Sequence, residues 1–287
     1  KDVTNIINSA EIEISGIRID KQYYEWLDIY NEFYENNQSY SNILSKGYNN
    51  NLIKNSNYSI STNYIPLRFW FNNNIGLALP VSALQLSDIR LLVEFNPLIA
   101  QNIEIIDVNL LINHIFLDGN ERKRFLRNDH EYLIEQLQIS GPETTDNIDL
   151  IFNHPVKSIF WNIYGANYDS VSLKLNNHFV FNNSSDYFHL IQPYESDFVN
   201  NYSMNTSTRI WSYGKTRTDQ NHNKSVYSFC LLPKLHQPSG SCNFSKIHSA
   251  IMKFENLSSS SYSIYVFAIN YNVLKVINGM GGLLYAN

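Results

Sequence analysis

The sequence of 287 residues is poor in cysteine and in charge. Its 2 cysteines are too few for a disulfide framework, which favours a protein of a reducing compartment. Charged residues make up 16% of the chain, and the net charge of −5 argues against a surface built to neutralise nucleic-acid phosphates. No apolar run approaches the roughly 20 residues that a membrane-spanning helix needs.

The motifs of common enzyme sites are absent as well. The sequence has no G-x-S-x-G nucleophile elbow, no phosphate-binding P-loop and no G-x-G-x-x-G dinucleotide fingerprint. GMGG at 279–282 follows a predicted strand, but no nucleotide-binding helix follows it, so its glycines are expected to allow a bend or a close backbone approach. We therefore expect no catalytic site, no cofactor and no metal.

Thiols and imidazoles recur at six-residue intervals near the end of the chain, at Cys230, His236, Cys242 and His248. Both groups bind zinc, but structural zinc sites usually place paired ligands about two to four residues apart. The spacing here favours two buried thiols and two loop histidines.

Two other groups combine a histidine with carboxylates: His130 with Glu131 and Glu135, and His114 with Asp118 and Glu121. The first group lacks the H-E-x-x-H order of zinc proteases, because residue 134 is isoleucine. The second group flanks a turn after a predicted strand, where charged side chains are usually solvated. Neither pattern is specific enough to predict a site.

The 4 tryptophans are the side chains best suited to stack on a sugar. Three lie in periodic apolar segments and are expected in the core: Trp26, Trp70 and Trp161. Trp211 lies in a polar stretch and is the one expected to be exposed, with Glu195 and Asp197 as the nearest acidic pair.

The strongest positive signal is an internal repeat at a spacing of about 160 residues. Residues 11–30 read EIEISGIRIDKQYYEWLDIY, and residues 172–191 read SLKLNNHFVFNNSSDYFHLI. Each copy has an alternating strand, a tight turn, a second strand and an aromatic helical segment. Two shorter echoes follow: RFWF at 68–71 with SFCL at 228–231, and IRLLVEFN at 89–96 with AIMKFEN at 250–256.

Further strands are predicted from apolar runs at 66–71, 75–81, 89–95, 108–118, 148–152 and 157–165. Asp20 is expected to cap a helix that carries Tyr23 and Leu27 on its buried face. Residues 120–138 begin with a helical pattern, and the end of this stretch fits either a helix or a strand.

Polar, aperiodic stretches at 36–64 and 193–224 predict a long loop at the same point of each copy. Ser140-Gly141-Pro142 predicts a turn at a domain boundary, which gives domains at 1–142 and 148–287. Many short strands with few helices predict an all-β sandwich, barrel or jelly roll. Almost nothing precedes the first strand of the first copy, so this copy is expected to lack its opening strands. The sequence is therefore expected to be a fragment of a longer protein.

Several stretches resemble the major capsid protein of nucleocytoplasmic large DNA viruses. They occur in the family's order and are spread from residue 11 to residue 287: 11–32, 66–95, 117–138, 152–161, 236–247 and 269–287. The resemblance implies a tandem double jelly roll, two antiparallel β-sandwich domains of which the first is incomplete. It also implies a homotrimer with a near-hexagonal outline, with the long loops as an outward crown.

The function implied by the resemblance is that of an icosahedral shell protein without enzymatic activity. The partners implied are other capsomers and minor capsid and penton proteins, with no direct nucleic-acid contact and with apposition to an internal viral membrane. The virion would be its location, after assembly in the host cytoplasm. Two alternatives stay open: a transient lattice that shapes a viral membrane, and a jelly-roll carbohydrate-binding protein.

A jelly roll without its opening strands would expose unpaired backbone and apolar faces. We therefore predict that residues 1–287 alone aggregate or need a further segment to fold. Size-exclusion chromatography with light scattering tests this, and a soluble, stable monomer would contradict it.

Overall fold

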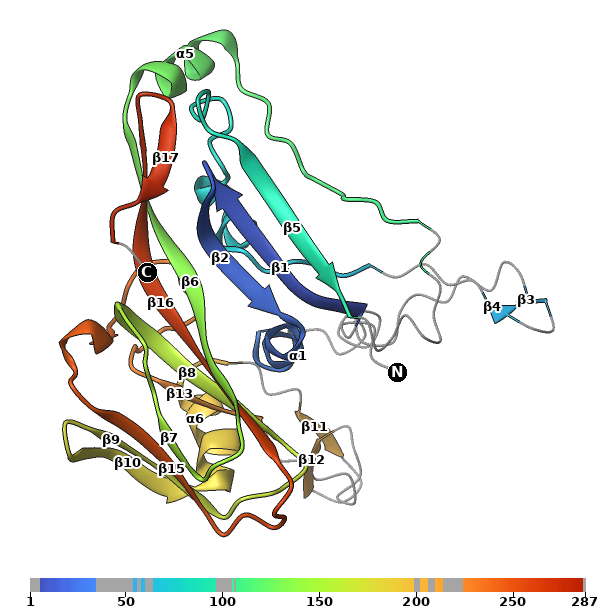
Figure 1. Cartoon of the computed structure of the whole chain (residues 1–287), viewed down its shortest axis with the longest axis vertical. Coiled ribbons are helices and arrows are strands. Elements are labelled where there is room, and N and C mark those ends of the chain that lie inside the picture. Colours follow the sequence, from blue (N-terminus) through green and yellow to red (C-terminus); the bar gives the residue numbers. More distant parts are fainter. Residues whose placement is uncertain are drawn as a thin grey trace. The chain divides into compact units, whose positions relative to one another are not determined.

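The computed structural model describes the backbone of residues 6–34, 54–55, 58–59, 64–96, 105, 107–198, 202–205, 210–213 and 224–285. Its described part is mainly β-strand, and the strand pairs for which a direction is recorded are antiparallel (Figure 1). Among the described residues, no helix has the length and the apolar content to span a membrane.

The chain divides into two compact units, and neither is one continuous segment. Unit 1 comprises residues 1–24, 44–136 and 272–287, and unit 2 comprises residues 25–43 and 137–271. The division falls inside two long strands, β6 (His130–Glu143) and β16 (Ser263–Ile277).

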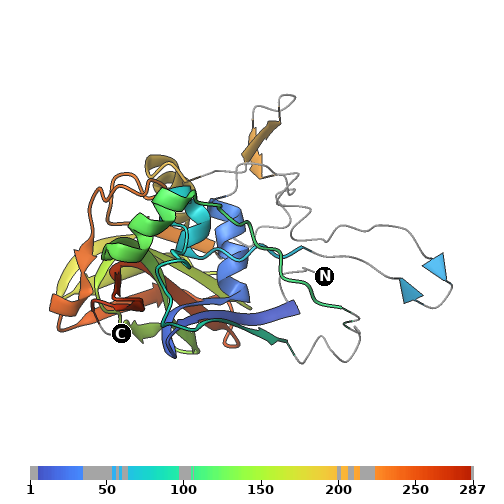
Figure 2. The same cartoon turned by 90° about the horizontal axis from the view of Figure 1, so that it is seen from above.

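Unit 1 contains a sheet of strand order β2-β1-β5. Its strands are β1 (Ile7–Ile14), β2 (Ile17–Tyr23) and β5 (Ile89–Phe95). Figures 1 and 2 show β1 and β5 side by side, as their ladder requires. The β1–β2 turn is made by Ser15 and Gly16, both with left-handed backbone angles (φ 54° and 75°), as a tight hairpin turn needs.

Unit 2 contains a sheet of strand order β10-β9-β15-β7. Its strands are β7 (Asn147–Asp149), β9 (Ser170–Leu175), β10 (His178–Ser184) and β15 (Ala250–Glu255). The β9–β10 turn is made by Asn176 and Asn177, again with left-handed backbone angles (φ 49° and 68°).

The two sheets have the same register, residue for residue. Adding 161 to the pair Ile14↔Ile89 gives the pair Leu175↔Ala250 (14 + 161 = 175; 89 + 161 = 250). The same shift converts every recorded β1–β5 pair from residue 9 to residue 14 into a β9–β15 pair. It also converts the β1–β2 pairs into the β9–β10 pairs, including the position of the β-bulge. The predicted repeat is therefore confirmed as a repeat of geometry.

A second group of strands completes unit 2. β8 (Pro155–Tyr164) pairs with β16 over Ser263–Asn270 and with β13 (Lys224–Ser228) and β14 (Cys242–Asn243). In unit 1, the end of β16 pairs with β17 (Met280–Leu283).

Each unit has its own apolar core. The core of unit 1 includes Ala10 and Ile12 of β1 with Trp70 and Ile134, and the core of unit 2 includes their repeat equivalents Val171 and Leu173 with other buried residues. The alternation predicted for residues 11–14 therefore places Ile12 and Ile14 inward.

Helical segments follow both hairpins at the same point of the repeat. α1 (Tyr24–Phe33) follows β2, and the π-helical turn η3 (Tyr187–Ile191) with α6 (Gln192–Glu195) follows β10. The helix predicted after β2 is confirmed, but Asp20 lies within β2 and does not cap it.

Each predicted loop contains a two-stranded antiparallel hairpin. β3 (Lys54–Asn55) pairs with β4 (Tyr58–Ser59), and β11 (Tyr202–Asn205) pairs with β12 (Ile210–Tyr213). Most other residues of 36–64 and 193–224 lie outside the described residues.

Four strand or turn predictions are wrong. Residues 66–81 contain two short helical turns, α3 (Trp70–Asn73) and η2 (Ile75–Leu77), and no strand, because helical turns bury Trp70 and Leu77 in the core of unit 1 as a strand would. Residues 108–118 are extended but join no ladder with the described residues. β6 continues through Ser140-Gly141-Pro142, where a turn was predicted.

The strands predicted at 89–95 and 157–165 are confirmed as β5 and β8, and the strand predicted at 148–152 is confirmed only at its start, in β7. The ambiguous stretch 120–138 resolves into helix α5 (Gly119–Arg127) followed by β6.

Gly281 of β17 lies against Leu84 and Ile14, and an added Cβ would stand 2.6 Å from Leu84 Cδ2 and 2.9 Å from Ile14 Cγ2. We predict that Gly281→Ala lowers the free energy of unfolding by about 1–3 kcal/mol through overpacking. Gly282→Ala is the matched control, because a Cβ there meets nothing within 4 Å. Urea titration of both variants measures the difference, and equal stability would contradict this packing.

Candidate functional site

The thiols and imidazoles of the zinc pattern do not form a metal site. Cys230 is buried, Cys242 is half-buried in β14, and both are free thiols. Burial raises the pKa of the Cys242 thiol, which makes it less reactive. Within the described ranges, no three residues among His, Cys, Asp and Glu gather closely enough to hold a metal ion.

The group around His130 serves the junction between α5 and β6. The Nε2 atom of His130 lies 2.8 Å from the Phe125 carbonyl oxygen, which only accepts hydrogen bonds, so the imidazole donates. Glu131 forms an ion pair with Lys275 of β16 at 2.7 Å. Two of the three residues of this group, His130 and Glu131, therefore have structural roles.

The carboxylates of the His114 group form the N-terminal cap of α5. The Asp118 side chain accepts hydrogen bonds from the backbone N–H groups of Asn120 (2.8 Å) and Glu121 (2.7 Å). The Glu121 carboxylate accepts in turn from the Asp118 backbone N–H at 3.2 Å. This is a capping box, which satisfies donors at the helix start. Both carboxylates therefore have a structural role at the start of α5.

Three of the tryptophans are core residues, as predicted: Trp26, Trp70 and Trp161 are each at most 3% exposed. The side chain of Trp211 lies outside the described part of the chain. Glu195 accepts a hydrogen bond from the Tyr187 hydroxyl at 3.4 Å, and Asp197 follows α6 in a left-handed conformation.

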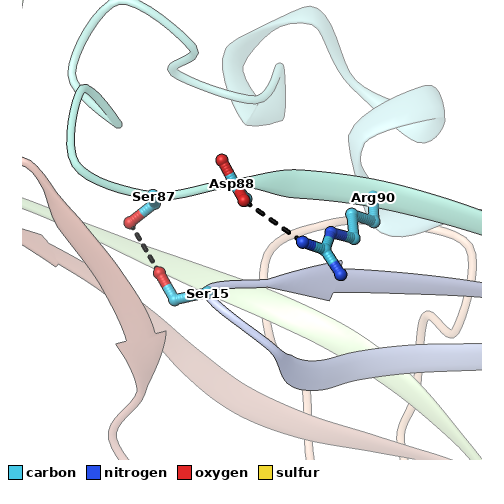
Figure 3. A network of polar contacts seen from close by, with 4 residues as sticks. All are labelled: Ser15, Ser87, Asp88 and Arg90. Carbon is cyan, nitrogen blue, oxygen red and sulfur yellow. Dashed lines mark hydrogen bonds and ion pairs between the residues drawn. The ribbon is translucent and has the colours of Figure 1, made fainter.

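The Ser87 hydroxyl joins three segments of unit 1 that are distant in sequence (Figure 3). It accepts a hydrogen bond from the Ser15 hydroxyl at 2.8 Å and another from the Gly281 backbone N–H at 3.0 Å. The Leu86 N–H donates to the Gly279 carbonyl at 2.9 Å. The β1–β2 turn, the approach to β5 and the β16–β17 turn therefore meet at one point.

The glycines of 279–282 act there as the sequence predicted. Gly279 has a left-handed φ of 82° in the β16–β17 turn, and Gly281 allows the close approach described above. Beside this junction, Arg90 pairs with Asp88 at 3.3 Å, but both side chains are mostly exposed, so the pair contributes little (Figure 3).

A largely buried ion cluster fixes α1 to β13 within unit 2. The ammonium of Lys224 lies 2.8 Å from Asp28 Oδ2 and 2.9 Å from Glu32 Oε2. Burial alone would lower the pKa of Lys224, but the charges of Glu32 and Asp28 outweigh it and raise that pKa. The Nδ1–H group of His189 donates to the Lys224 carbonyl at 2.7 Å.

Sequence reasoning missed both junctions. Asp28 and Glu32 are four residues apart, so the two carboxylates lie side by side on one face of the helix. Because like charges at this spacing repel each other, the pattern indicates a nearby cation. Nothing near Lys224 in sequence identifies it as that cation. The Ser87 contacts join residues up to 194 positions apart and have no local signal.

Large apolar side chains are exposed on both units. In unit 1, six of them lie in the segment 107–118: Val108, Leu110, Leu111, Ile112, Ile115 and Phe116. In unit 2, five of them lie on two segments: Ile191, Tyr194, Leu231, Leu232 and Leu235. Clusters of exposed apolar side chains are typical of surfaces that bind another molecule. The arrangement therefore offers surfaces for association.

Two family descriptions match the chain. "Major capsid protein N-terminus" matches residues 3–118, and "Large eukaryotic DNA virus major capsid protein" matches residues 164–282. The major capsid protein of Pyramimonas orientalis virus is 38% identical over 310 residues, which cover 98% of this chain and 77% of that protein.

Solved structures agree in fold. The crystal structure of PBCV-1 VP54, fitted into a cryo-EM reconstruction of the virophage Sputnik, has a TM-score of 0.75 and 27% identity, covering 100% of this chain and 85% of that chain. The quasi-atomic model of the PBCV-1 virus capsid has a TM-score of 0.73 and 27% identity, with the same coverage. The predicted fold, an all-β tandem double jelly roll, is confirmed by these neighbours.

We predict that Lys224→Met lowers the free energy of unfolding by about 1–2 kcal/mol, less than for a fully buried pair because water reaches Asp28. The variant leaves two carboxylates on one face of α1 without their cation. Lys253→Met is the control, because its partner Glu255 is 3.6 Å away on the surface and its loss should cost less than about 0.5 kcal/mol.

The raised pKa of Lys224 fixes the pH dependence of this difference. The pKa of Lys224 is higher in the folded protein than in the unfolded chain. Such a lysine contributes its full stabilisation of the fold at pH values below the unfolded pKa. This contribution is lost as the pH rises through the folded pKa. The difference between wild type and variant should thus stay constant between about pH 6 and 9. Chemical denaturation across that range measures it, and no loss of stability in Lys224→Met would refute the role of the cluster.

Proposed function

The chain belongs to the family of major capsid proteins of large eukaryotic DNA viruses, and from this premise we propose that it is a structural shell protein whose role is assembly and not catalysis. The observation that carries the proposal is the duplicated sheet, whose two copies share one register at a shift of 161 (14 + 161 = 175). A chain with two similar units presents similar contact surfaces twice. A protein that covers a surface with repeated copies needs such repeated contacts.

We propose that three chains form a capsomer with a near-hexagonal outline. Three chains with two jelly rolls each present six similar bodies around a three-fold axis. A three-fold oligomer then approaches six-fold symmetry, so a few types of contact can cover an icosahedral surface. Its partners would be further copies of itself, with minor capsid and penton proteins at special positions. The structural neighbour in the PBCV-1 virus capsid supports this reading.

We propose that the two jelly rolls correspond in sequence to residues 1–142 and 148–287, although residues 25–43 belong to compact unit 2 and residues 272–287 to compact unit 1. The two family matches support this division, since residues 3–118 fall within the first range and residues 164–282 within the second. The stretches 36–64 and 193–224 are proposed as the outward crown. Their support is that each follows a helical segment at the same point of the repeat and holds a hairpin.

The location proposed is the capsid shell of the virion, after assembly in the host cytoplasm, with an internal viral membrane on one side. The net charge of −5 favours a shell role without direct nucleic-acid contact. The carbohydrate-binding alternative depends on Trp211, whose side chain lies outside the described part of the chain, and the matching family and relative are capsid proteins.

Native mass spectrometry of the natural gene product tests the capsomer. We expect a dominant species at three times the mass of one chain that persists on dilution, because obligate oligomers bury large apolar interfaces. A monomer that stays dominant at all concentrations would overturn autonomous capsomer formation.

A further inference from the structure

The helical segment of the first copy packs in unit 2. All of α1 except its first residue belongs to unit 2, although β2, the strand before it, belongs to unit 1. The ring centroid of Trp26 lies 5.1 Å from that of Phe160 in β8 and 5.8 Å from that of Phe267 in β16. The ring centroid of Phe33 lies 5.8 Å from that of Phe160. Aromatic pairs at these separations are favourable, so one face of α1 is covered by aromatic rings.

The second copy has a helical segment at the same place in the repeat. Residues 185–195 are helical through η3 and α6, and they correspond to residues 24–34 at the shift of 161 (24 + 161 = 185). Phe188 anchors this segment in the core of unit 2, because its ring centroid lies 5.2 Å from that of Trp161 and 4.6 Å from that of Phe181. One face of the second helical segment is therefore buried in its own unit.

Another face differs between the two helical segments. Phe33 is 1% exposed, whereas its equivalent Tyr194 is 79% exposed (33 + 161 = 194). Tyr30 is half-buried, whereas its equivalent Ile191 is 47% exposed (30 + 161 = 191). Ile191 and Tyr194 are three residues apart, so they lie on one face of the helical segment. The face that is covered by aromatic rings in α1 is therefore an exposed apolar face in the second copy.

A neighbouring segment of unit 2 extends this exposed face. α6 packs against β13, and the chain continues from β13 to the exposed Leu231 and Leu235. Burial lowers the pKa of Lys234, and the charge of Asp197, which follows α6, acts in the opposite direction. The two segments are therefore neighbours, and together they present a larger apolar surface than the helical segment alone.

A second copy of the chain is the occupant that the repeat indicates. The face of unit 2 that receives a helix is already filled by α1 in every copy. Unit 1 is the other unit built on the same sheet register, and it exposes large apolar side chains such as Leu111 and Phe116. We therefore expect unit 1 of another chain to receive the second helical segment, as unit 2 receives α1.

We propose that the surface formed by Ile191, Tyr194, Leu231 and Leu235 packs on unit 1 of a second copy of the chain. The contact repeats between chains the packing that α1 makes in unit 2 within one chain. It joins unlike surfaces of the two copies, and a head-to-tail contact of this kind closes into a ring when the rotation between copies permits it. The inference rests on the proposed capsomer, since three such contacts would close a ring of three chains.

Matched substitutions test this surface by native mass spectrometry of the natural gene product. We expect Tyr194→Lys and Ile191→Lys each to raise the concentration at which half of the trimer dissociates by about tenfold or more, because each would bury an unpaired charge. Ile151→Lys is the control, because Ile151 is 84% exposed and lies between β7 and β8, and it should leave that concentration unchanged. Far-ultraviolet circular dichroism checks that all three variants keep the fold.

A photoreactive benzophenone side chain in place of Tyr194 identifies the receiving surface. In a mixture of isotopically light and heavy chains, we expect cross-links between the two kinds of chain. The receiving residues should lie in unit 1, at 1–24, 44–136 or 272–287. Cross-links confined to a single chain, or reaching only unit 2 of the other chain, would overturn the proposal.

The outcomes separate this interface from the capsomer. A trimer that Tyr194→Lys leaves unchanged, or that Ile191→Lys and Ile151→Lys weaken equally, would overturn the interface and leave the capsomer intact. A wild-type chain that stays monomeric at all concentrations would overturn both.

Discussion

The antiparallel ladder between β1 and β5, repeated between β9 and β15, is the constraint on which the rest of the chain depends. A slip of one residue would turn Ile12 and Leu173 away from their cores, so the register must be held. Each copy holds it with a two-residue left-handed turn and a bulge at the same position. The ladder fixes where the helical segment after each hairpin begins, and the long polar stretch of each copy follows that segment.

The two copies share this frame but differ in what covers it. In unit 2, β7 closes the edge of β15, and β8 places Trp161 in the buried core. In unit 1, the C-terminal strand pair is attached instead through the Ser87 hydroxyl and through Gly281, while β5 and segment 107–118 remain open among the described residues.

Features set by local patterns could be predicted from the sequence. The hairpins, β5 and β8 follow from period-2 alternation and turn residues, and the three core tryptophans follow from apolar periodicity. The prediction of strands in residues 66–81 was wrong, because an apolar run does not distinguish a strand from a helical turn that fills a core. Segment 108–118 has the composition of a strand. Whether it joins a ladder depends on a partner strand, and the local sequence does not show whether one is present. The Ser87 junction and the Lys224 cluster depend on contacts distant in sequence.

A capsid role gives this duplication a purpose, since one chain with two similar β units can repeat its contacts around a three-fold axis. Cryo-electron microscopy of particles assembled from the natural gene product tests that claim most directly. The account predicts near-hexagonal units, each with density for six jelly rolls contributed by three chains. Particles whose repeating unit holds a different number of chains, or in which this protein is absent from the shell, would contradict it.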